Sequence, residues 1–411
     1  MKIEVINTGS ELLLGTTLNT HGAWIGMELM QLGLRVQRQT TVPDGEAIIE
    51  ALQEALQRSD AVIVTGGIGP TSDDISREAA AEVLGVDLIT DEAALRSIET
   101  YFAHRGRPMA EDNKKQALNP VGADVLPNPN GTAPGIYAPP RMSGDRLCGL
   151  FLLPGPPHEM KPMFQQEVLP RLRSLADVDE EVSLQTLRFT SIGESDFHAT
   201  LDAELTAIPQ LEIGYCSRPG EVDLRLIGKP SAVAKGRALA LREFSKECFS
   251  KNGEELEQAV VRVLLDVGKT LSTAESCTGG GIASRVTDVS GASAVFTHGF
   301  VTYSNEAKTE LLGVAEDLFT HHGAVSEQVA IAMAEGALRK SNADVAVAVT
   351  GIAGPTGGTA DKPVGTVWVG IATAKNSRAV KKFYPHGRAI FKRLVSQFAL
   401  DLVRRELMEN N

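Results

Sequence analysis

Apolar runs of strand length alternate with helix-like patterns over the first 170 residues of the chain. Residues 3–7 and 61–65 are short aliphatic runs, whereas residues 20–32 and the stretch that ends at Leu56 repeat apolar positions at helical spacing. A strand that returns through a helix enters the same sheet in the same direction. The alternation therefore predicts a doubly wound, mostly parallel α/β sheet.

Three of the apolar runs end in turns that are rich in glycine. The turns cover residues 7–15 (NTGSELLLG), 65–74 (TGGIGPTSDD) and 153–160 (LPGPPHEM). Ligands of such sheets bind outside the carboxyl ends of the strands. We therefore expect the three turns to line one cleft.

The pattern changes at about residue 171 and changes again after residue 253. The middle stretch is typical of a small α+β unit, with a strand over 182–192, a helix over 195–205, a hairpin around 218–220 and a helix over 233–249. The α/β alternation then resumes and predicts a third domain with its own sheet. Its elements are a helix to 267, a strand over 270–273, a helix from 278, a strand ending at 350 and an amphipathic helix after 387.

Composition agrees with a globular protein of several domains. The 411 residues are 43% hydrophobic and 22% charged, which allows about three ordinary cores. With 40 Lys and Arg against 52 Asp and Glu, the net charge is −12, and this charge argues against nucleic acid as a main partner. No apolar run reaches the ~18 residues of a membrane span, and no signal peptide pattern precedes the first strand. We expect a protein that is neither exported nor embedded in a membrane.

The four cysteines give no sign of a metal site or a disulfide framework. Cys148, Cys216, Cys248 and Cys277 lie far apart and form no CxxC pair. Reduced, separate cysteines fit a cytoplasmic protein.

The strongest chemical signal is the segment TAESCTGG, residues 273–280. It leads from a predicted strand through Ser276 and Cys277 into a helix whose first turn would contain Gly279 and Gly280. A nucleophile at that position lies beside backbone amides that can stabilise an oxyanion, and either side chain could attack. The plainer explanation of Ser276 is an N-cap.

A serine nucleophile needs a base, and the segment YSNEAK, residues 303–308, offers one. A lysine whose pKa is lowered by burial can accept the serine proton, and Lys308 is the candidate. The alternative is that Lys308 is an ordinary solvated lysine on a helix. Arg388 begins the last predicted helix, where its planar fork could bind a phosphate or a carboxylate.

Two glycine turns share a local pattern. Residues 62–71 (VIVTGGIGPT) and 347–356 (VAVTGIAGPT) both lead from a buried strand into a turn whose amides suit a phosphate. Their surroundings do not match at any constant offset. We interpret the similarity as convergence rather than duplication.

Acidic residues near the strand-to-helix turns of the first domain are candidate metal ligands. They are Glu11, Asp44, Asp73 and Asp74. The adjacent carboxylates of Asp73 and Asp74 could hold a divalent cation against a diphosphate, or could complement a helix dipole. His21 and His298 lack metal-ligand spacing, and we interpret them as structural.

Taken together, the motifs resemble those of the CinA family over nearly the whole chain. The first part resembles the molybdopterin-binding fold through TGSELLLG, NTH, VPDG, TGGIGPTSDD, NGTAPG and LPGPPHEM, and the last part resembles nicotinamide mononucleotide deamidases through TAESCTGG, VTYSNEAK, AVTGIAGPTGG, PVGTVWVG and HGR. The resemblance implies a three-layer α/β domain over residues 1–170, a KH-like α+β domain over 171–252 and an α/β deamidase domain over 253–411.

For the last domain, the resemblance implies hydrolysis of nicotinamide mononucleotide to nicotinate mononucleotide and ammonia, without a cofactor. Ser276 would be the nucleophile, Lys308 its base and Tyr303 an assisting hydroxyl. The residues implied to contact the substrate are Gly279, Gly280, Asn305, Thr350, Gly351, Gly354 and Arg388, the last as a ligand of the phosphate or of the transition state.

For the first domain, the resemblance implies hydrolysis of ADP-ribose to AMP and ribose 5-phosphate, with Mg²⁺ or a similar divalent cation and with potassium. The metal ligands would be Glu11, Asp73 and Asp74. The nucleotide would lie against Asn19, Gly66, Gly67, Gly69 and Thr71. Family members usually carry asparagine where this chain has His21, so the cleft lining differs at that residue.

The KH-like segment departs from the RNA-binding KH domains. Those domains clamp the nucleic acid backbone with a GXXG loop, and none occurs between residues 181 and 250. We expect this segment to act as a spacer and dimerisation element of a homodimer. The whole chain would be a bifunctional enzyme of pyridine nucleotide salvage. Two other hypotheses are an adaptor in DNA uptake or damage, and a pterin-binding module with a degenerate amidase.

Overall fold

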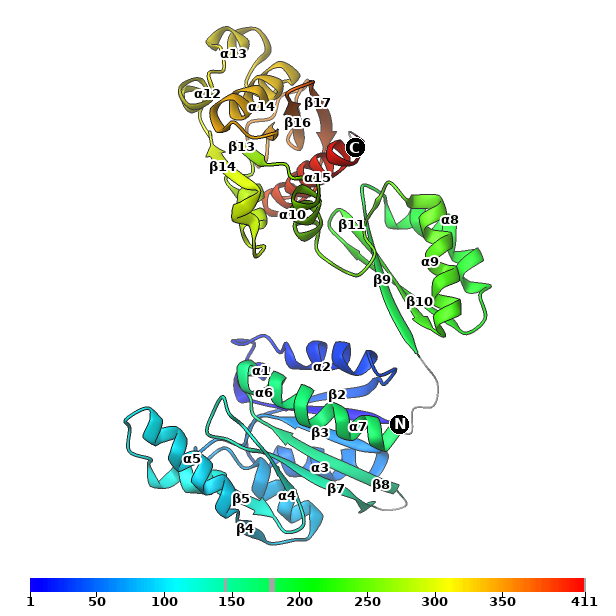
Figure 1. Ribbon diagram of the computed structural model, residues 1–411, viewed down its shortest axis with the longest axis vertical. Coiled ribbons are helices and arrows are strands. Elements are labelled where there is room, and N and C mark those ends of the chain that lie inside the picture. Colours follow the sequence, from blue (N-terminus) through cyan, green and yellow to red (C-terminus); the bar gives the residue numbers. More distant parts are fainter. Residues whose placement is uncertain (144–145, 177–181, 410–411) are drawn as a thin grey trace. The chain divides into compact units, whose positions relative to one another are not determined.

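The computed structural model describes residues 1–143, 146–176 and 182–409 (Figure 1). The chain divides into two compact units, residues 1–183 and 184–411. The predicted middle and last domains thus share the second unit. Among the helices that the structure describes, none is both long enough and apolar enough to cross a membrane.

The first unit is built on a six-stranded sheet with the order β2-β1-β3-β8-β7-β6. Its parallel strands are β2 (Val36–Val42), β1 (Ile3–Thr8), β3 (Ala61–Thr65) and β8 (Arg146–Leu153). The strand β7 (Gly135–Ser143) is antiparallel to β8, and β6 (Asp124–Leu126) is antiparallel to β7. A small pair, β4 (Leu88–Thr90) and β5 (Leu118–Pro120), accompanies α5 (Glu92–His104).

Helices cover both faces of this sheet, because neighbouring side chains of a strand point to opposite faces. Val62 and Val64 of β3 belong to one buried cluster, and Ile63 belongs to the other. The helices of the first cluster are α3 (Ala47–Arg58) and α4 (Ser76–Leu84), and those of the second are α2 (His21–Met30), α6 (Pro157–Met163) and α7 (Leu169–Ala176). The predicted three-layer α/β architecture is confirmed.

The second unit begins with a four-stranded sheet, order β10-β11-β9-β12, backed by two helices (Figure 1). Its elements are β9 (Ser183–Thr190), α8 (Glu194–Thr206), β10 (Leu211–Arg218), β11 (Glu221–Gly228), α9 (Pro230–Phe244) and β12 (Cys248–Ser250). The helix predicted over 233–249 is wrong at its end. Cys248 packs into the core of this sheet and Phe249 into the following core, and a strand places adjacent side chains on opposite sides in this way.

The remainder of the second unit is a five-stranded sheet with the order β14-β13-β15-β16-β17. The strands β14 (Phe296–Val301), β13 (Leu271–Glu275) and β15 (Val345–Gly351) are parallel, and β16 (Thr366–Thr373) and β17 (Ser377–Phe383) are antiparallel. One face carries α10 (Leu256–Val267), α11 (Gly281–Thr287) and α15 (Arg388–Glu409), and the other carries α12 (Asn305–Leu312), α13 (Glu316–His322) and α14 (Glu327–Ser341).

Side-chain size along β15 explains how closely these two layers pack. Val345 and Val347 face α10 and α15, whereas Ala346 and Ala348 face α14. A Cβ on Gly370 of the neighbouring strand would lie 2.3 Å from Ala330 O, so α14 approaches the sheet backbone closely. Small residues on this face therefore permit the close approach.

Candidate functional site

The polar site of the last sheet lies where β14, β13 and β15 end. Ser276 follows β13, and its backbone N–H donates to Val349 O at 3.1 Å. Thr302 follows β14, and its N–H donates to Glu275 O at 2.8 Å. Parallel strands end at the same edge of a sheet, so segments far apart in the sequence meet around Ser276.

The loop after β13 differs from the prediction. Gly279 and Gly280 lie before the helix, with φ of 60° and 91°, and α11 begins at Gly281 with Gly280 as its N-cap. Glycine adopts these left-handed conformations without steric cost. Ser276 is therefore not the N-cap of α11, which removes the plainer explanation of this serine.

Glu275 is fully buried beneath this loop, and the sequence analysis missed it. Its carboxylate accepts hydrogen bonds from Thr278 Oγ1 at 2.6 Å and from the N–H groups of Ile282 and Ala283 at 3.0 and 2.8 Å. These bonds use amides of the first turn of α11 that were expected to face an oxyanion. Among the hydrogen bonds of the described residues, none is donated by the Gly280 N–H. An acidic residue just before a helix was the available signal.

Lys308 is the second buried polar residue of the site, with 1% of its surface exposed. Its Nζ lies 3.3 Å from Ser276 Oγ, 3.0 Å from Thr302 O, 3.2 Å from Ser304 O and 3.4 Å from Tyr303 O. The expectation of a solvated lysine is wrong, and the two residues proposed as nucleophile and base are in hydrogen-bond range.

The environment of Lys308 suits a proton acceptor. Burial lowers the pKa of Lys308 below its ordinary value, and it outweighs the opposing effects of Cys277 and Glu306. A neutral amine can donate to two backbone carbonyls while its lone pair accepts the Ser276 proton. The carbonyl of Thr302 and its neighbours then stabilise the ammonium that forms.

Cys277 lies beside the serine but faces the apolar core. Its side chain is 4% exposed and packs with the cluster that contains Ile282 and Val349. Burial raises the pKa of the Cys277 thiol to about 12. The thiolate is the reactive form of cysteine, so these surroundings favour Ser276 as the nucleophile.

Tyr303 and Arg388 are linked at the same edge. Arg388 Nη2 donates to Tyr303 Oη at 2.6 Å, and Arg388 Nη1 donates to Gly354 O at 3.0 Å. Tyr303 is 59% exposed, so its ring lies at the mouth of the site. One guanidinium therefore connects the start of α15 with the loops after β14 and β15.

Of the remaining residues predicted for this site, two are explained by structural contacts and one is exposed. The hydroxyl of Thr350 donates to Ala324 O at 2.7 Å, and a Cβ on Gly351 would lie 2.9 Å from Thr366 O. Asn305 is exposed at the start of α12. The structure therefore explains Thr350 and Gly351 by packing and places Asn305 at the surface.

In the first unit, the three glycine turns follow the adjacent strands β1, β3 and β8. Gly66 N–H donates to Leu153 O at 2.9 Å, and a Cβ on Gly66 would lie 2.8 Å from Thr8 O. The φ angles of Gly66 and Gly67 are 99° and 66°. The turns therefore meet at one sheet edge.

A chain of hydrogen bonds crosses this edge and includes His21. Thr65 Oγ1 donates to Asn7 Oδ1 at 3.0 Å and lies 3.2 Å from His21 Nδ1. The hydroxyl has one proton, so His21 Nδ1 must be the donor to Thr65, and Nε2 then carries the lone pair. Burial is the main cause that lowers the pKa of His21, and Lys161 adds to it. His21 is thus a neutral residue of this sheet edge. The backbone N–H of His21 donates to Asn19 Oδ1 at 3.1 Å.

The acidic residues of the first unit do not converge. Asp74 Oδ2 accepts from Thr71 N at 3.0 Å and also from the Thr71 hydroxyl, and Asp73 is exposed. A hydrogen bond from Thr71 is the main cause that lowers the pKa of Asp73. Within residues 1–143, 146–176 and 182–409, no three His, Cys, Asp or Glu side chains are grouped to hold a metal ion. Glu11, Asp73 and Asp74 are therefore not brought together as three ligands of one ion.

Arg77 is a further residue that the sequence analysis missed. Its side chain is 1% exposed and donates to the carbonyls of Ile68 and Gly69 in the glycine turn. Burial lowers the pKa of Arg77 to about 10. A buried guanidinium thus fixes the turn from behind.

Both α/β sheets lie in segments that match profiles of known protein families. The profile described as "CinA C-terminal domain" matches residues 253–407, and the profile described as "Probable molybdopterin binding domain" matches residues 4–174. A CinA-like protein of Akkermansia muciniphila is 51% identical over 401 residues, which is 97% of this chain and 96% of the relative. A CinA-like protein of Kosmotoga olearia is 40% identical over 99% of both chains.

A solved structure is similar to part of the chain. The competence/damage inducible protein CihA of Agrobacterium tumefaciens is 44% identical, and the match covers 36% of this chain and 90% of that protein, with a TM-score of 0.35.

Proposed function

The chain belongs to the CinA family, and starting from that membership we propose that its last domain hydrolyses nicotinamide mononucleotide to nicotinate mononucleotide and ammonia. The observation that carries this proposal is the buried Lys308 with its Nζ 3.3 Å from Ser276 Oγ. Amide hydrolysis requires an activated nucleophile, and no solvated lysine could provide it.

The geometry suggests the course of the reaction. Neutral Lys308 takes the proton of Ser276, and the serine oxygen attacks the carboxamide carbon to give a tetrahedral oxyanion. The ammonium of Lys308 returns the proton to the leaving nitrogen, which departs as ammonia and leaves an ester on Ser276. The same lysine then takes a proton from water, the hydroxide adds to the ester carbon, and the ammonium returns the proton to the leaving Ser276 oxygen. The acid that is released ionises to the carboxylate.

The test is to incubate the pure protein with nicotinamide mononucleotide and to identify the products. We expect ammonia and nicotinate mononucleotide in equal amounts. Binding of the nucleotide without ammonia release would contradict the proposal. It would favour the adaptor or the degenerate amidase, and an adaptor would keep its binding after Ser276→Ala and Lys308→Ala.

For the first domain we propose hydrolysis of ADP-ribose to AMP and ribose 5-phosphate. The supporting observation is the junction of the glycine turns, where Gly66, Gly67 and the neutral His21 lie at one sheet edge. Backbone amides in such turns suit a diphosphate. Tight binding of a pterin without hydrolysis would instead support the pterin-binding hypothesis.

The dependence of this activity on a divalent cation and potassium stays a prediction. Among the described residues no three acidic or histidine or cysteine side chains are grouped, and in this proposal the diphosphate and water complete the ligands of the cation. We expect a chelator to abolish ADP-ribose hydrolysis and the variants Asp73→Asn and Asp74→Asn to lower it. Turnover that survives the chelator would contradict the cation requirement. A homodimer in the cytoplasm likewise remains part of the proposal.

A further inference from the structure

Arg388 was expected to bind the substrate phosphate or the transition state, and in the structure its guanidinium has two partners. Nη1 and Nη2 donate to Gly354 O and Tyr303 Oη at 3.0 and 2.6 Å. A guanidinium that joins two loops in this way positions them for the substrate. Neither partner neutralises the guanidinium, and a second cation beside the loop of residues 276–281 would add to the binding of a phosphate.

Lys392 is such a cation. It lies four residues after Arg388, which puts both on the same face of α15. A Cβ on Gly279 would lie 3.7 Å from Lys392 Nζ, so the ammonium lies directly against the loop that follows Ser276. In the described part of the chain, no hydrogen bond or ion pair joins Lys392 Nζ to another residue.

A cavity of about 310 Å³ opens beside this lysine. Its wall includes Gly281, at the end of the loop of residues 276–281, and Lys392, Arg393 and Ser396 on α15. The cavity therefore runs from the loop of residues 276–281 along α15. The residues that line it do not include Tyr303 or Arg388.

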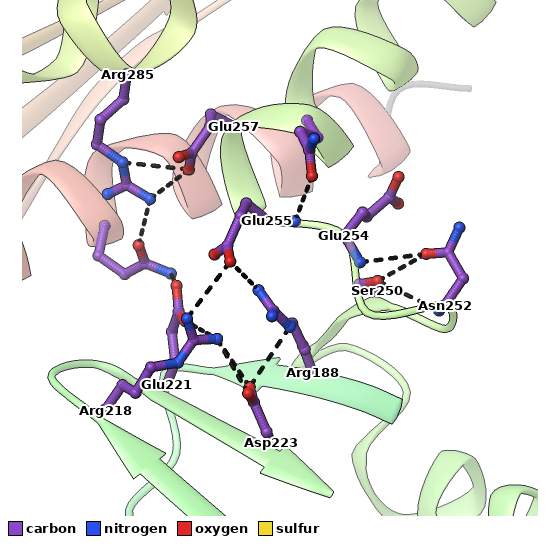
Figure 2. Close-up of polar contacts among 12 residues, drawn as sticks. Arg188, Arg218, Glu221, Asp223, Ser250, Asn252, Glu254, Glu255, Glu257 and Arg285 are labelled. Carbon is purple, nitrogen blue, oxygen red and sulfur yellow. Dashed lines mark hydrogen bonds and ion pairs between the residues drawn. The ribbon is translucent and has the colours of Figure 1, made fainter. Parts of the chain in front are cut away.

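Two carboxylates also line the cavity, and both are held by arginines (Figure 2). Glu257 accepts from Arg285 Nη2 at 2.6 Å, and Glu255 Oε1 lies 2.6 Å from Arg188 Nη1 and 3.5 Å from Arg218 Nη1. Arg188 and Arg218 come from the strands β9 and β10. The carboxylate charges are thus compensated, and Lys392 and Arg393 leave the cavity with an excess of positive charge.

We propose that this cavity binds the phosphate of a mononucleotide substrate, with Lys392 as its main ligand. The proposal rests on the deamidase function proposed above and adds to it the site that selects nucleotides over nucleosides. In a mononucleotide the ribose lies between the phosphate and the ring that carries the carboxamide. In the protein the loop of residues 276–281 lies between Ser276 and the cavity, so the carboxamide would lie at Ser276 and the phosphate in the cavity. A charged hydrogen bond to a dianion is among the stronger polar contacts in proteins.

The first test compares nicotinamide mononucleotide with nicotinamide riboside, which lacks the phosphate. We expect Lys392→Ala to raise the KM for the mononucleotide about 10- to 100-fold, with little change in kcat or in turnover of the riboside. Lys392→Arg should restore most of the affinity. Lys340→Ala removes an exposed lysine from the end of α14 and serves as the matched control.

Two results would overturn the phosphate site. One is an equal loss of activity of Lys392→Ala on both substrates, which indicates a structural role. The other is an unchanged KM for the mononucleotide. If the parent protein releases no ammonia from either substrate, the deamidase proposal fails on its own.

A binding measurement decides the phosphate site without turnover. Calorimetry of the Ser276→Ala protein with nicotinamide mononucleotide should give weaker binding, by the same factor, when Lys392→Ala is added. Equal affinity of the two proteins, or no binding to either, would contradict the proposal. Competition by inorganic phosphate should also be lost with Lys392→Ala.

Discussion

The two α/β sheets end in turns of nearly the same sequence, yet the turns have different contacts. In residues 62–71 the threonine hydroxyl donates to Asn7 at the sheet edge, next to His21. In residues 347–356 the equivalent Thr350 donates to Ala324 O and helps to fix a neighbouring loop. The shared letters specify a buried strand that ends in a tight turn, but they do not specify what the turn contacts.

The two edges also differ in their reactive groups. The second edge has a buried lysine within reach of a serine, so it can form a covalent intermediate. The first edge instead carries backbone amides, Thr65, Asn7 and a neutral histidine, with Asp74 and Arg77 bound within the glycine turn. Hydrolysis at the first edge would therefore use water as its nucleophile.

Removing the serine or the lysine should produce the largest separation of the two activities. We expect Ser276→Ala and Lys308→Ala each to lower kcat/KM for ammonia release by about 10³-fold or more, with ADP-ribose turnover unchanged. Cys277→Ala should stay within tenfold of the parent protein. If only the cysteine variant lost activity, the nucleophile would be Cys277 and not Ser276.

The two loops are held in place by opposite charges, and this difference predicts an effect on stability. Glu275 binds three donors beneath the second loop, whereas Arg77 binds two carbonyls beneath the first. Glu275→Ala should leave buried amides without an acceptor and lower the free energy of unfolding by about 2–3 kcal/mol. Denaturant unfolding measures this change, and Glu257→Ala is a control at a partly exposed carboxylate. A change below about 0.5 kcal/mol would contradict the role of Glu275.

Hydrophobic patterning predicted the layers of both sheets because each central strand is covered on both faces. It failed at Cys248 and Phe249, where a short strand between two cores has no periodic pattern long enough to be distinguished from the end of a helix. The glycine turns were placed correctly because strand ends and glycine pairs are local features of the sequence.

The site was predictable only where residues carry their role within a motif. The motifs pointed to Ser276 and Lys308 as a pair, and the structure brings these two side chains together, but the partners of Arg388 and the position of Lys392 depend on how α15 packs against two distant loops. Whether Glu11 lies near Asp73 and Asp74 also depends on the tertiary structure. The strand alternation alone gave no distance between these side chains.

The pH dependence of the two activities should differ. The active form of Lys308 is neutral, and burial lowers its pKa below the ordinary 10.5. Ammonia release should therefore rise with pH, tenfold per unit, until it levels off at that lowered pKa. ADP-ribose hydrolysis depends on no such lysine and should lack this limb. A deamidase rate that is flat between pH 6 and 9 would place the pKa below 6 or remove Lys308 from the mechanism, and the Lys308→Ala profile distinguishes these outcomes.

The smallest expected effect concerns His21, which distinguishes this chain from family members with asparagine at that position. Because burial keeps His21 neutral near pH 7, His21→Asn removes no charge, and an amide can still donate to Thr65 Oγ1. We expect ADP-ribose turnover to change less than about tenfold, within the range of one neutral hydrogen bond, and ammonia release to stay the same. His21→Leu cannot donate to Thr65 and should lower turnover further. A larger loss with asparagine than with leucine would show that donation to Thr65 is not what His21 contributes at this edge.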